Sequence, residues 1–181
     1  AELYISGTRD VPGLAGASGL ASVGWDFGTL DLGQTNHYLL DLSDFTGSPD
    51  PLELAVSLNW FVADTFDPAT GITTYGSFAD LNLEVWSVSI GGAFDTLLAA
   101  SRTAFDNSEF LRIPLSPAGQ IGLRVLYAGM VYDFDGPLGG DVAYGLAWTT
   151  SVTPIPEPAA FAALLGLAAL GLAVQRRQPR R

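Results

Sequence analysis

Apolar and polar residues alternate in short stretches along most of the chain, from about residue 24 to residue 150. The clearest stretch covers residues 52–62, where every second residue from Leu52 to Trp60 is large and apolar. The residues between them include Glu53 and Asn59. Because the side chains of a β-strand point alternately to its two faces, this stretch predicts a strand with one buried face. We therefore expect Trp60 to face the interior.

The other stretches bring the total to seven or eight predicted strands, and no amphipathic helix of useful length is found. The expected strands cover residues 24–27, 37–42, 52–62, 81–88, 94–101, 109–115, 120–132 and 142–150. A lead-in rich in Gly, Ala and Ser precedes them at residues 1–22, with one short strand at 3–5. Short strands at this spacing are typical of an antiparallel β-sandwich or barrel, so the predicted fold class is all-β.

Two acidic loops are expected between these strands, at residues 64–79 and 133–141. The first loop contains Asp67-Pro68-Ala69-Thr70-Gly71, whose residues favour a tight turn. Asp106-Asn107 predicts another turn, made by side-chain hydrogen bonds to the backbone and held by Glu109.

The last part of the chain, residues 153–181, has a different pattern. It contains an apolar run at 159–174 with no charged or polar side chain. At about 1.5 Å per helical residue the run is roughly 24 Å long, at the lower edge of what spans a membrane. A core helix would carry a polar face, so a membrane helix is the better interpretation. The arginines that follow are expected to stay on the cytoplasmic side: Arg176, Arg177, Arg180 and Arg181.

The apolar run comes directly after Pro156-Glu157-Pro158. This order of a Pro-Glu-Pro motif, a short hydrophobic helix and a basic end resembles the PEP-CTERM sorting signal of exported bacterial proteins. The resemblance implies that a membrane enzyme of the exosortase type recognises the signal and cuts near Pro156, Glu157 and Pro158. The helix would then be discarded, so the precursor would stay in the inner membrane only transiently.

Without this tail the chain is a single-domain body, residues 1–152, that can bury about 70% of the surface of its unfolded chain. The body contains 18 acidic residues and four arginines, which gives a formal charge of −14, and the chain has no lysine. Such a surface cannot neutralise a phosphate backbone, which excludes a nucleic-acid partner. The absence of cysteine excludes disulfides and thiolate chemistry.

A series of short sequence motifs lies within or beside the predicted strands. In order they are Gly24-Trp25-Asp26, Leu58-Asn59-Trp60, Asp80-Leu81-Asn82-Leu83-Glu84-Val85, Asp106-Asn107-Ser108-Glu109, Gly119 with Leu123-Arg124-Val125, and Tyr144-Gly145-Leu146-Ala147-Trp148. The series resembles the jelly-roll-like β-sandwich, of the pre-peptidase C-terminal type, that follows the catalytic domain of many subtilisin-like proteases. Asn82 stands where that family usually has Asp, and Ile121 stands where it has Tyr. Both departures weaken the case for transferring a metal site of that family to this chain.

The residue types give little support to catalysis. Ser-His-Asp chemistry needs a histidine base, and the one histidine, His37, accompanies no Gly-x-Ser-x-Gly motif. A single histidine without cysteine argues against zinc. Acidic residues are abundant, but no pair is singled out by its spacing for glycosidase chemistry.

The best remaining candidate for a bound ion is Ca²⁺ in the second acidic loop. Asp133 and Asp135 stand two residues apart beside Gly136, and Asp141 ends the loop. Carboxylates are the hard oxygen ligands that Ca²⁺ prefers. The alternative is a solvated acidic turn, because the remaining ligands of an EF-hand loop are missing.

These patterns predict a non-catalytic, exported β-sandwich of the cell envelope or extracellular matrix. It would contact exopolysaccharide or other matrix components, or serve as a protease accessory module. The alternative is the C-terminal part of a secreted subtilisin-like protease, because the chain opens with Ala1 and is expected to be a fragment or a processed form. Catalytic Asp, His and Ser motifs upstream of Ala1 would indicate the protease, and a signal peptide ending there would exclude it.

Overall fold

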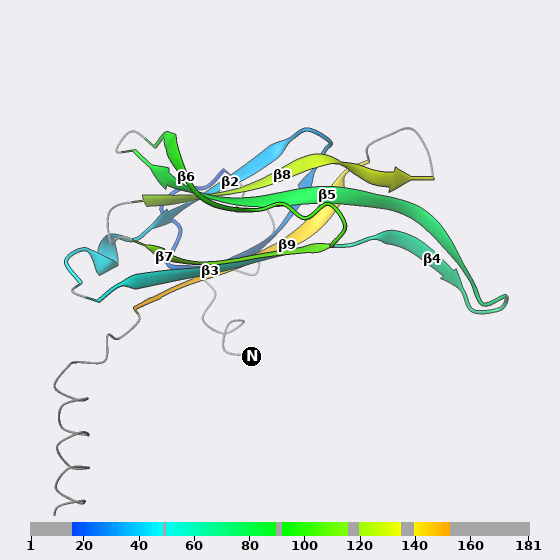
Figure 1. The fold of residues 1–181 in the computed structure, drawn as a ribbon, viewed down its shortest axis with the longest axis horizontal. Coiled ribbons are helices and arrows are strands. Elements are labelled where there is room, and N and C mark those ends of the chain that lie inside the picture. Colours follow the sequence, from blue (N-terminus) through cyan, green and yellow to red (C-terminus); the bar gives the residue numbers. More distant parts are fainter. Residues whose placement is uncertain (1–15, 49, 90–91, 116–119, 135–139, 153–181) are drawn as a thin grey trace, which may run out of the picture.

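The computed structural model describes residues 16–48, 50–89, 92–115, 120–134 and 140–152. Within these residues the chain forms two antiparallel sheets that pack face to face (Figure 1). The predicted all-β class and the antiparallel sandwich are therefore confirmed. The described residues contain nine strands, one or two more than expected, and a single 3-10 turn, η1 (Ser43–Phe45).

The four-stranded sheet has the order β1-β9-β3-β7, and the five-stranded sheet has the order β2-β8-β5-β4, with β6 also paired to β5. The strands are β1 (Val23–Leu30), β2 (Thr35–Asp41), β3 (Leu52–Trp60), β4 (Ala63–Asp67), β5 (Ile72–Val88), β6 (Phe94–Ser101), β7 (Ser108–Leu115), β8 (Gln120–Asp133) and β9 (Val142–Val152). Strand β6 has the predicted bounds, and residues 16–22 of the lead-in contain only an isolated bridge between Leu20 and Leu40. The strand predicted at 3–5 lies outside the described residues.

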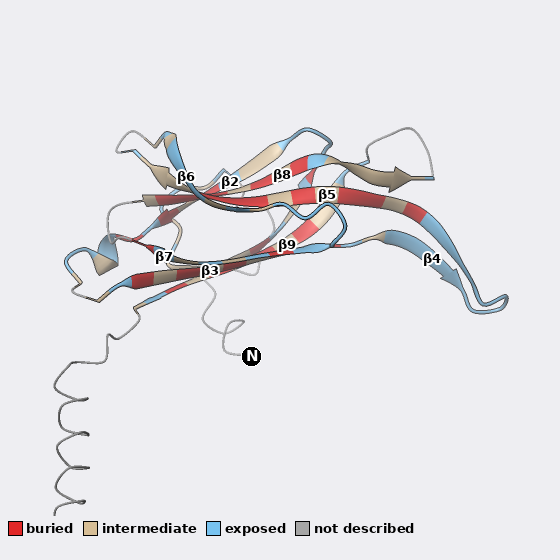
Figure 2. Cartoon of the chain, viewed as in Figure 1, coloured by how far each residue is buried: buried red, intermediate tan, exposed pale blue. Residues whose placement is uncertain are grey.

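The hydrophobic core lies between the two sheets, where the buried residues gather (Figure 2). Strand β3 shows how the alternating pattern builds it, since Leu54, Val56 and Leu58 point inward and are at most 1% exposed. Trp60 is 2% exposed, and its indole N–H donates a 2.8 Å hydrogen bond to the Ala79 carbonyl of β5. The prediction that Trp60 faces the interior is confirmed.

Strand β1 turns Gly24, Asp26, Gly28 and Leu30 toward the core, and its aromatic residues away from it. Gly24 and Gly28 stand opposite Trp148 and Tyr144 of β9. A Cβ atom added to Gly24 would lie 2.4 Å from the Trp148 ring, and one added to Gly28 would lie 2.6 Å from the Tyr144 hydroxyl. The large rings of β9 therefore fill the space that inward side chains of β1 would need. The aromatic residues of β1 are left on the outer face of the sheet.

A buried carboxylate ties the two sheets together. Asp26 of β1 is 1% exposed, and its Oδ2 accepts a 2.9 Å hydrogen bond from the Tyr38 hydroxyl of β2. The Tyr38 and Tyr144 hydroxyls lie 2.7 Å apart, and Asn36 Nδ2 donates to the Tyr144 hydroxyl at 2.9 Å. Burial raises the pKa of both tyrosines, so both hydroxyls stay protonated. The cluster adds directional contacts to an otherwise apolar core.

The outer face of the five-stranded sheet is covered by its own side chains. Glu84 of β5 is 4% exposed and accepts hydrogen bonds from Arg102 and, at 2.8 Å, from the Trp86 indole. Arg124 of β8 lies 3.6 Å from Glu84, and its guanidinium packs over the Trp86 and Phe94 rings. Cation–π contacts and charge-assisted hydrogen bonds therefore close this face.

The prediction of a loop at residues 64–79 is wrong, because these residues form a β-hairpin. Strand β4 pairs with the start of β5, and the hairpin extends beyond the sandwich (Figure 1). The turn predicted at its tip is confirmed: Asp67 Oδ1 accepts a 2.9 Å hydrogen bond from the Ala69 N–H, and Gly71 has a φ of 69°. We call this hairpin, residues 63–77, the arm.

Candidate functional site

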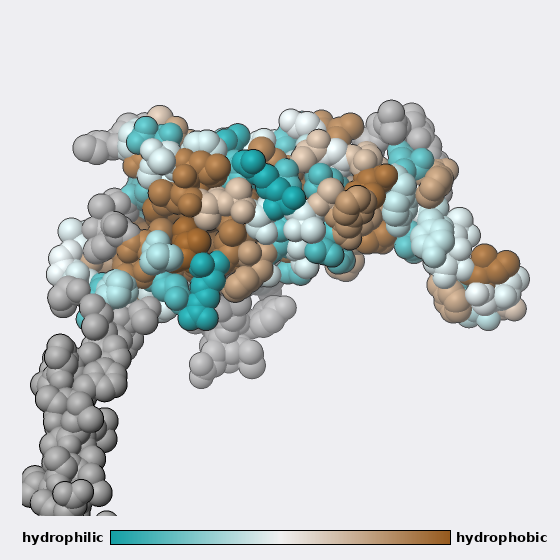
Figure 3. All heavy atoms as spheres, in the orientation of Figure 1, coloured by the Kyte–Doolittle hydropathy of each residue, from teal (hydrophilic) through white to brown (hydrophobic). Residues whose placement is uncertain are grey.

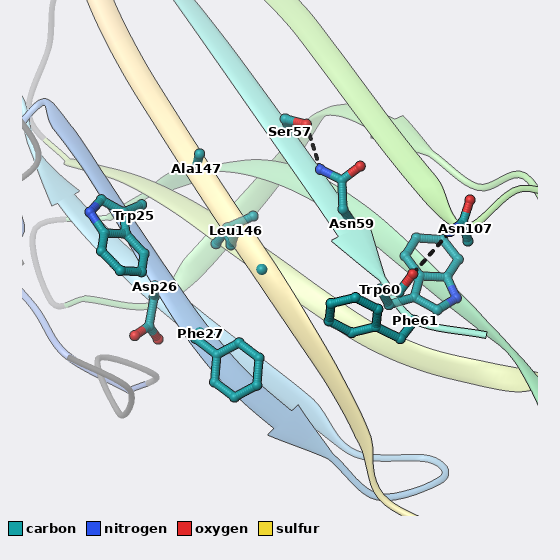
Figure 4. A pocket seen from close by; sticks show the side chains of 11 residues that line it. Trp25, Asp26, Phe27, Ser57, Asn59, Trp60, Phe61, Asn107, Leu146 and Ala147 are labelled. Atoms are coloured by element: carbon teal, nitrogen blue, oxygen red, sulfur yellow. Dashed lines mark hydrogen bonds between the residues drawn. The ribbon is translucent and has the colours of Figure 1, made fainter. Parts of the chain in front are cut away.

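A groove of about 510 Å³ lies on the outer face of the four-stranded sheet (Figure 4). Its lining comes from β1, β9 and β3 and from the residues that flank β3 and β7. The lining residues are Trp25, Asp26, Phe27, Ser57, Asn59, Trp60, Phe61, Asn107, Gly145, Leu146 and Ala147.

The strand register gives the groove a low floor beside an aromatic wall. Trp25 and Phe27 of β1 stand opposite Ala147 and Gly145 of β9. These two small residues form the floor, and a Cβ atom added to Gly145 would meet nothing within 4 Å. Because neighbouring strands are about 4.8 Å apart, the backbones of β1 and β3 lie roughly 10 Å apart across the floor.

Phe61 supplies a third ring on the other side of the floor. Figure 4 shows Phe27 and Phe61 on either side of β9, with Trp25 further along β1. Phe61 is 77% exposed, but the residue before it is fixed. The Trp60 N–H donates to the Asn107 carbonyl and Asn107 Nδ2 donates to the Trp60 carbonyl, both at 3.1 Å. These two bonds hold the backbone that carries the Phe61 ring.

A buried glutamate holds the turn that carries Asn107. Glu109 is 2% exposed and accepts hydrogen bonds from the Ser101 hydroxyl and the Thr103 N–H. This confirms the prediction that Glu109 holds the turn. The Asn107 side chain was expected to bond within the turn, but it reaches across to β3 instead. The reason is that Asn107 stands where β7 begins beside the end of β3.

Ser57 and Asn59 of β3 place polar groups across the floor from Trp25 and Phe27. Asn59 Nδ2 donates a 3.0 Å hydrogen bond to Ser57 Oγ. The amide oxygen of Asn59 and the hydroxyl proton of Ser57 can then bond to a ligand. Aromatic rings around a few polar groups suit a ligand that has apolar faces and a polar edge.

The charges around the groove disfavour an anionic ligand. Every arginine in the described part of the chain is paired with a glutamate: Arg102 and Arg124 with Glu84, and Arg112 with Glu53 at 2.7 Å. Among the described residues, no basic side chain lines the groove. A carboxylate or phosphate group would therefore find no cation there.

The residues predicted for sorting lie outside the described residues. They are Pro156, Glu157 and Pro158, the hydrophobic helix at 159–174, and Arg176, Arg177, Arg180 and Arg181. Within the described ranges, no helix has the length and hydrophobicity that crossing a membrane requires.

The candidates for metal binding and catalysis do not gather at the groove. Asp133 ends β8 and Asp141 precedes β9, whereas Asp135 lies outside the described residues. In the residues that the structure describes, no three His, Cys, Asp or Glu side chains are placed to hold a metal ion. The calcium site at the three aspartates stays a prediction. His37 lies on the other sheet, with its ring 5.6 Å from that of Phe94.

Comparison with known protein families gives a result for the tail. The family model described as "PEP-CTERM protein-sorting motif" matches residues 154–178. The chain carries a PEP-CTERM sorting motif. This confirms the resemblance predicted from the sequence, and it indicates an exported protein that passes through the membrane and is recognised by an exosortase-type sorting enzyme.

The body was compared with curated proteins and with solved structures. No curated protein matches the chain. Among solved structures, the chain is similar to the pre-peptidase C-terminal domain of a collagenase from Bacillus anthracis, with 16% identity and a TM-score of 0.39. That match covers 73% of this chain and 91% of the collagenase domain.

Proposed function

We propose that the body is a non-catalytic module that binds a neutral polysaccharide in the groove of the four-stranded sheet. The PEP-CTERM motif supports delivery of this module across the inner membrane to the cell envelope or extracellular matrix. Polysaccharide is an abundant partner in both places. The body would then link sorted protein to the polymer around the cell.

The observation that carries the proposal is the arrangement of three rings around a small-residue floor. Trp25, Phe27 and Phe61 can pack against the apolar C–H faces of sugar rings, while Asn59 and Ser57 can bond to the hydroxyl groups at their edges. Since the groove lies on an outer sheet face, a long chain could pass through it without threading into the protein.

The charge of the body favours a neutral polymer over an acidic one. The formal charge of residues 1–152 is −14, and the described arginines are paired with glutamates. A polymer of uronic acids would meet long-range repulsion and no cation in the groove. Neutral glycans avoid this cost.

Native affinity electrophoresis of the purified full chain in detergent tests the proposal. Gels would contain hydroxyethyl cellulose, galactomannan or dextran as neutral polymers, and alginate as the acidic one. We expect retardation by at least one neutral polymer and none by alginate. Trp25→Ala and Phe61→Ala should each weaken the retardation about tenfold, which corresponds to about 1.4 kcal/mol of binding free energy.

Two further variants separate binding from folding. Gly145→Val should raise the floor into the groove, and a Cβ at this position meets nothing within 4 Å. Phe134→Ala is the matched control, since Phe134 is 73% exposed, close to the 77% of Phe61, but does not line the groove. Unchanged retardation by Gly145→Val, or an equal loss with Phe134→Ala, would contradict the groove as the binding site.

A further inference from the structure

The arm exposes apolar side chains at the end of the molecule. Phe66, Ile72 and Tyr75 are 61%, 61% and 58% exposed, and both strands of the arm are open to solvent (Figure 2). Figure 3 shows apolar atoms at the tip of the arm. A two-stranded hairpin is marginally stable in water by itself, and exposed apolar patches commonly mark interaction sites.

One edge of the arm offers backbone groups to a further strand. Strand β5 pairs with β8 only from Ser77 onward, so within the described residues its segment 72–75 is paired on the β4 side alone. Proteins usually protect such an edge with charged side chains or proline. Residues 72–75 read Ile-Thr-Thr-Tyr, which are all strand-forming residues without charge.

The edge of the arm carries no charge, and it therefore fits a second copy of this acidic chain. Residues 68–79 carry no charged side chain, whereas the β4 strand of the arm carries Asp64 and Asp67. Two bodies of formal charge −14 repel each other, and an uncharged edge is where two copies can meet without placing carboxylates together. We infer that the arm joins two copies by antiparallel strand addition along residues 72–75. This inference is independent of the polysaccharide groove.

Symmetry restricts how the two edges can meet. In a two-fold dimer the same surface patch serves both copies, and an antiparallel pair then places one residue opposite its own copy. The middle of the segment is Thr73 or Thr74, and either register pairs threonine with threonine across the interface. Cross-strand threonine pairs and β-branched–aromatic pairs are stabilising. The product is a four-stranded ribbon of two β4 strands outside two β5 strands.

The arm also lies away from the end of the body that leads to the sorting motif. Strand β3 begins at Leu52, which is paired with Val152, and ends at Trp60, just before the arm. The arm and Val152 are therefore at opposite ends of the sandwich (Figure 1). An antiparallel ribbon would leave the two bodies at its two ends, so the dimer would connect copies that face each other.

Cysteine crosslinking tests this inference directly, because the chain has no cysteine of its own. The full chain in detergent would carry Thr73→Cys or Thr74→Cys and would be treated with a mild oxidant. Directly opposite residues of an antiparallel pair have Cα atoms about 4.5–5.5 Å apart, which a disulfide can bridge. We expect one of the two variants to form disulfide-linked dimers at least about tenfold faster than the control Thr65→Cys, because docking raises the local thiol concentration.

The control lies on the other strand of the same exposed arm, so it measures crosslinking by random collision. Adding Tyr75→Asp to the reactive variant should remove the rate advantage, because a charged side chain on the edge of a sheet disfavours the addition of a further strand. Rates equal to that of Thr65→Cys for both variants would overturn the inference, as would an advantage that survives Tyr75→Asp.

Discussion

Trp60→Ala is expected to lower the free energy of unfolding by about 3–5 kcal/mol. The side chain is 2% exposed in the core between the sheets, so its removal leaves a large cavity. The substitution also removes the donor to the Ala79 carbonyl, which joins the two sheets. The measurement is a denaturant titration monitored by circular dichroism. The free energy of unfolding should depend on denaturant concentration with the same slope (m-value) in both proteins.

The neighbouring residue supplies the matched control. Phe61 has a similar size but is 77% exposed, so Phe61→Ala should change the free energy of unfolding by no more than about 0.5 kcal/mol. A loss of less than about 1 kcal/mol for Trp60→Ala would mean that the two faces of β3 are assigned the wrong way round.

Glu157→Ala is expected to abolish processing of the tail. The sorting motif matches residues 154–178, and the Pro156-Glu157-Pro158 sequence is the part that the sorting enzyme is predicted to recognise. In a host with the matching enzyme, a protein tagged at its N-terminus should lose roughly its last 25 residues. The substituted protein should keep them. Mass spectrometry of the released and membrane fractions measures both outcomes.

Glu53→Ala is the control for this experiment. It also removes one glutamate, but from the surface of β3, where Glu53 pairs with the exposed Arg112. Exposed ion pairs contribute about 0–1 kcal/mol, so the body should remain folded and processing should continue. An intact C-terminus on mature, released protein of the unsubstituted sequence would contradict cleavage of the tail.

The sequence predicted the strands well wherever a strand has one buried face. Strand β3 shows this, since it alternates along its whole length. Strand β6 also has the predicted bounds, although none of its residues is buried. The arm was missed because both of its faces are exposed, so the positions of its apolar residues carry no sign of a core. The high strand propensity of residues such as Thr73 and Tyr75 was the remaining indication of a hairpin. The prediction of a loop did not take it into account.

The groove could not be predicted from the sequence because it depends on a strand, β1, whose aromatic side chains point away from the core. In most strands the aromatic side faces the core, and Trp25 and Phe27 would be placed inside on that rule. They face outward because Trp148 and Tyr144 of β9 occupy the interior opposite two glycines of β1. Only the register between β1 and β9 reveals this. The sorting motif, in contrast, is local in the sequence and needs no knowledge of the fold.

The four tryptophans of the chain allow a direct measurement of polysaccharide binding in the groove. Only Trp25 lines the groove with its ring on the outer face, while Trp60 and Trp148 are in the core and Trp86 is on the other sheet. An NMR titration of the indole N–H signals with an oligosaccharide of the retarding polymer should shift the Trp25 signal alone. A shift of the Trp86 signal with an unmoved Trp25 signal would contradict binding in the groove.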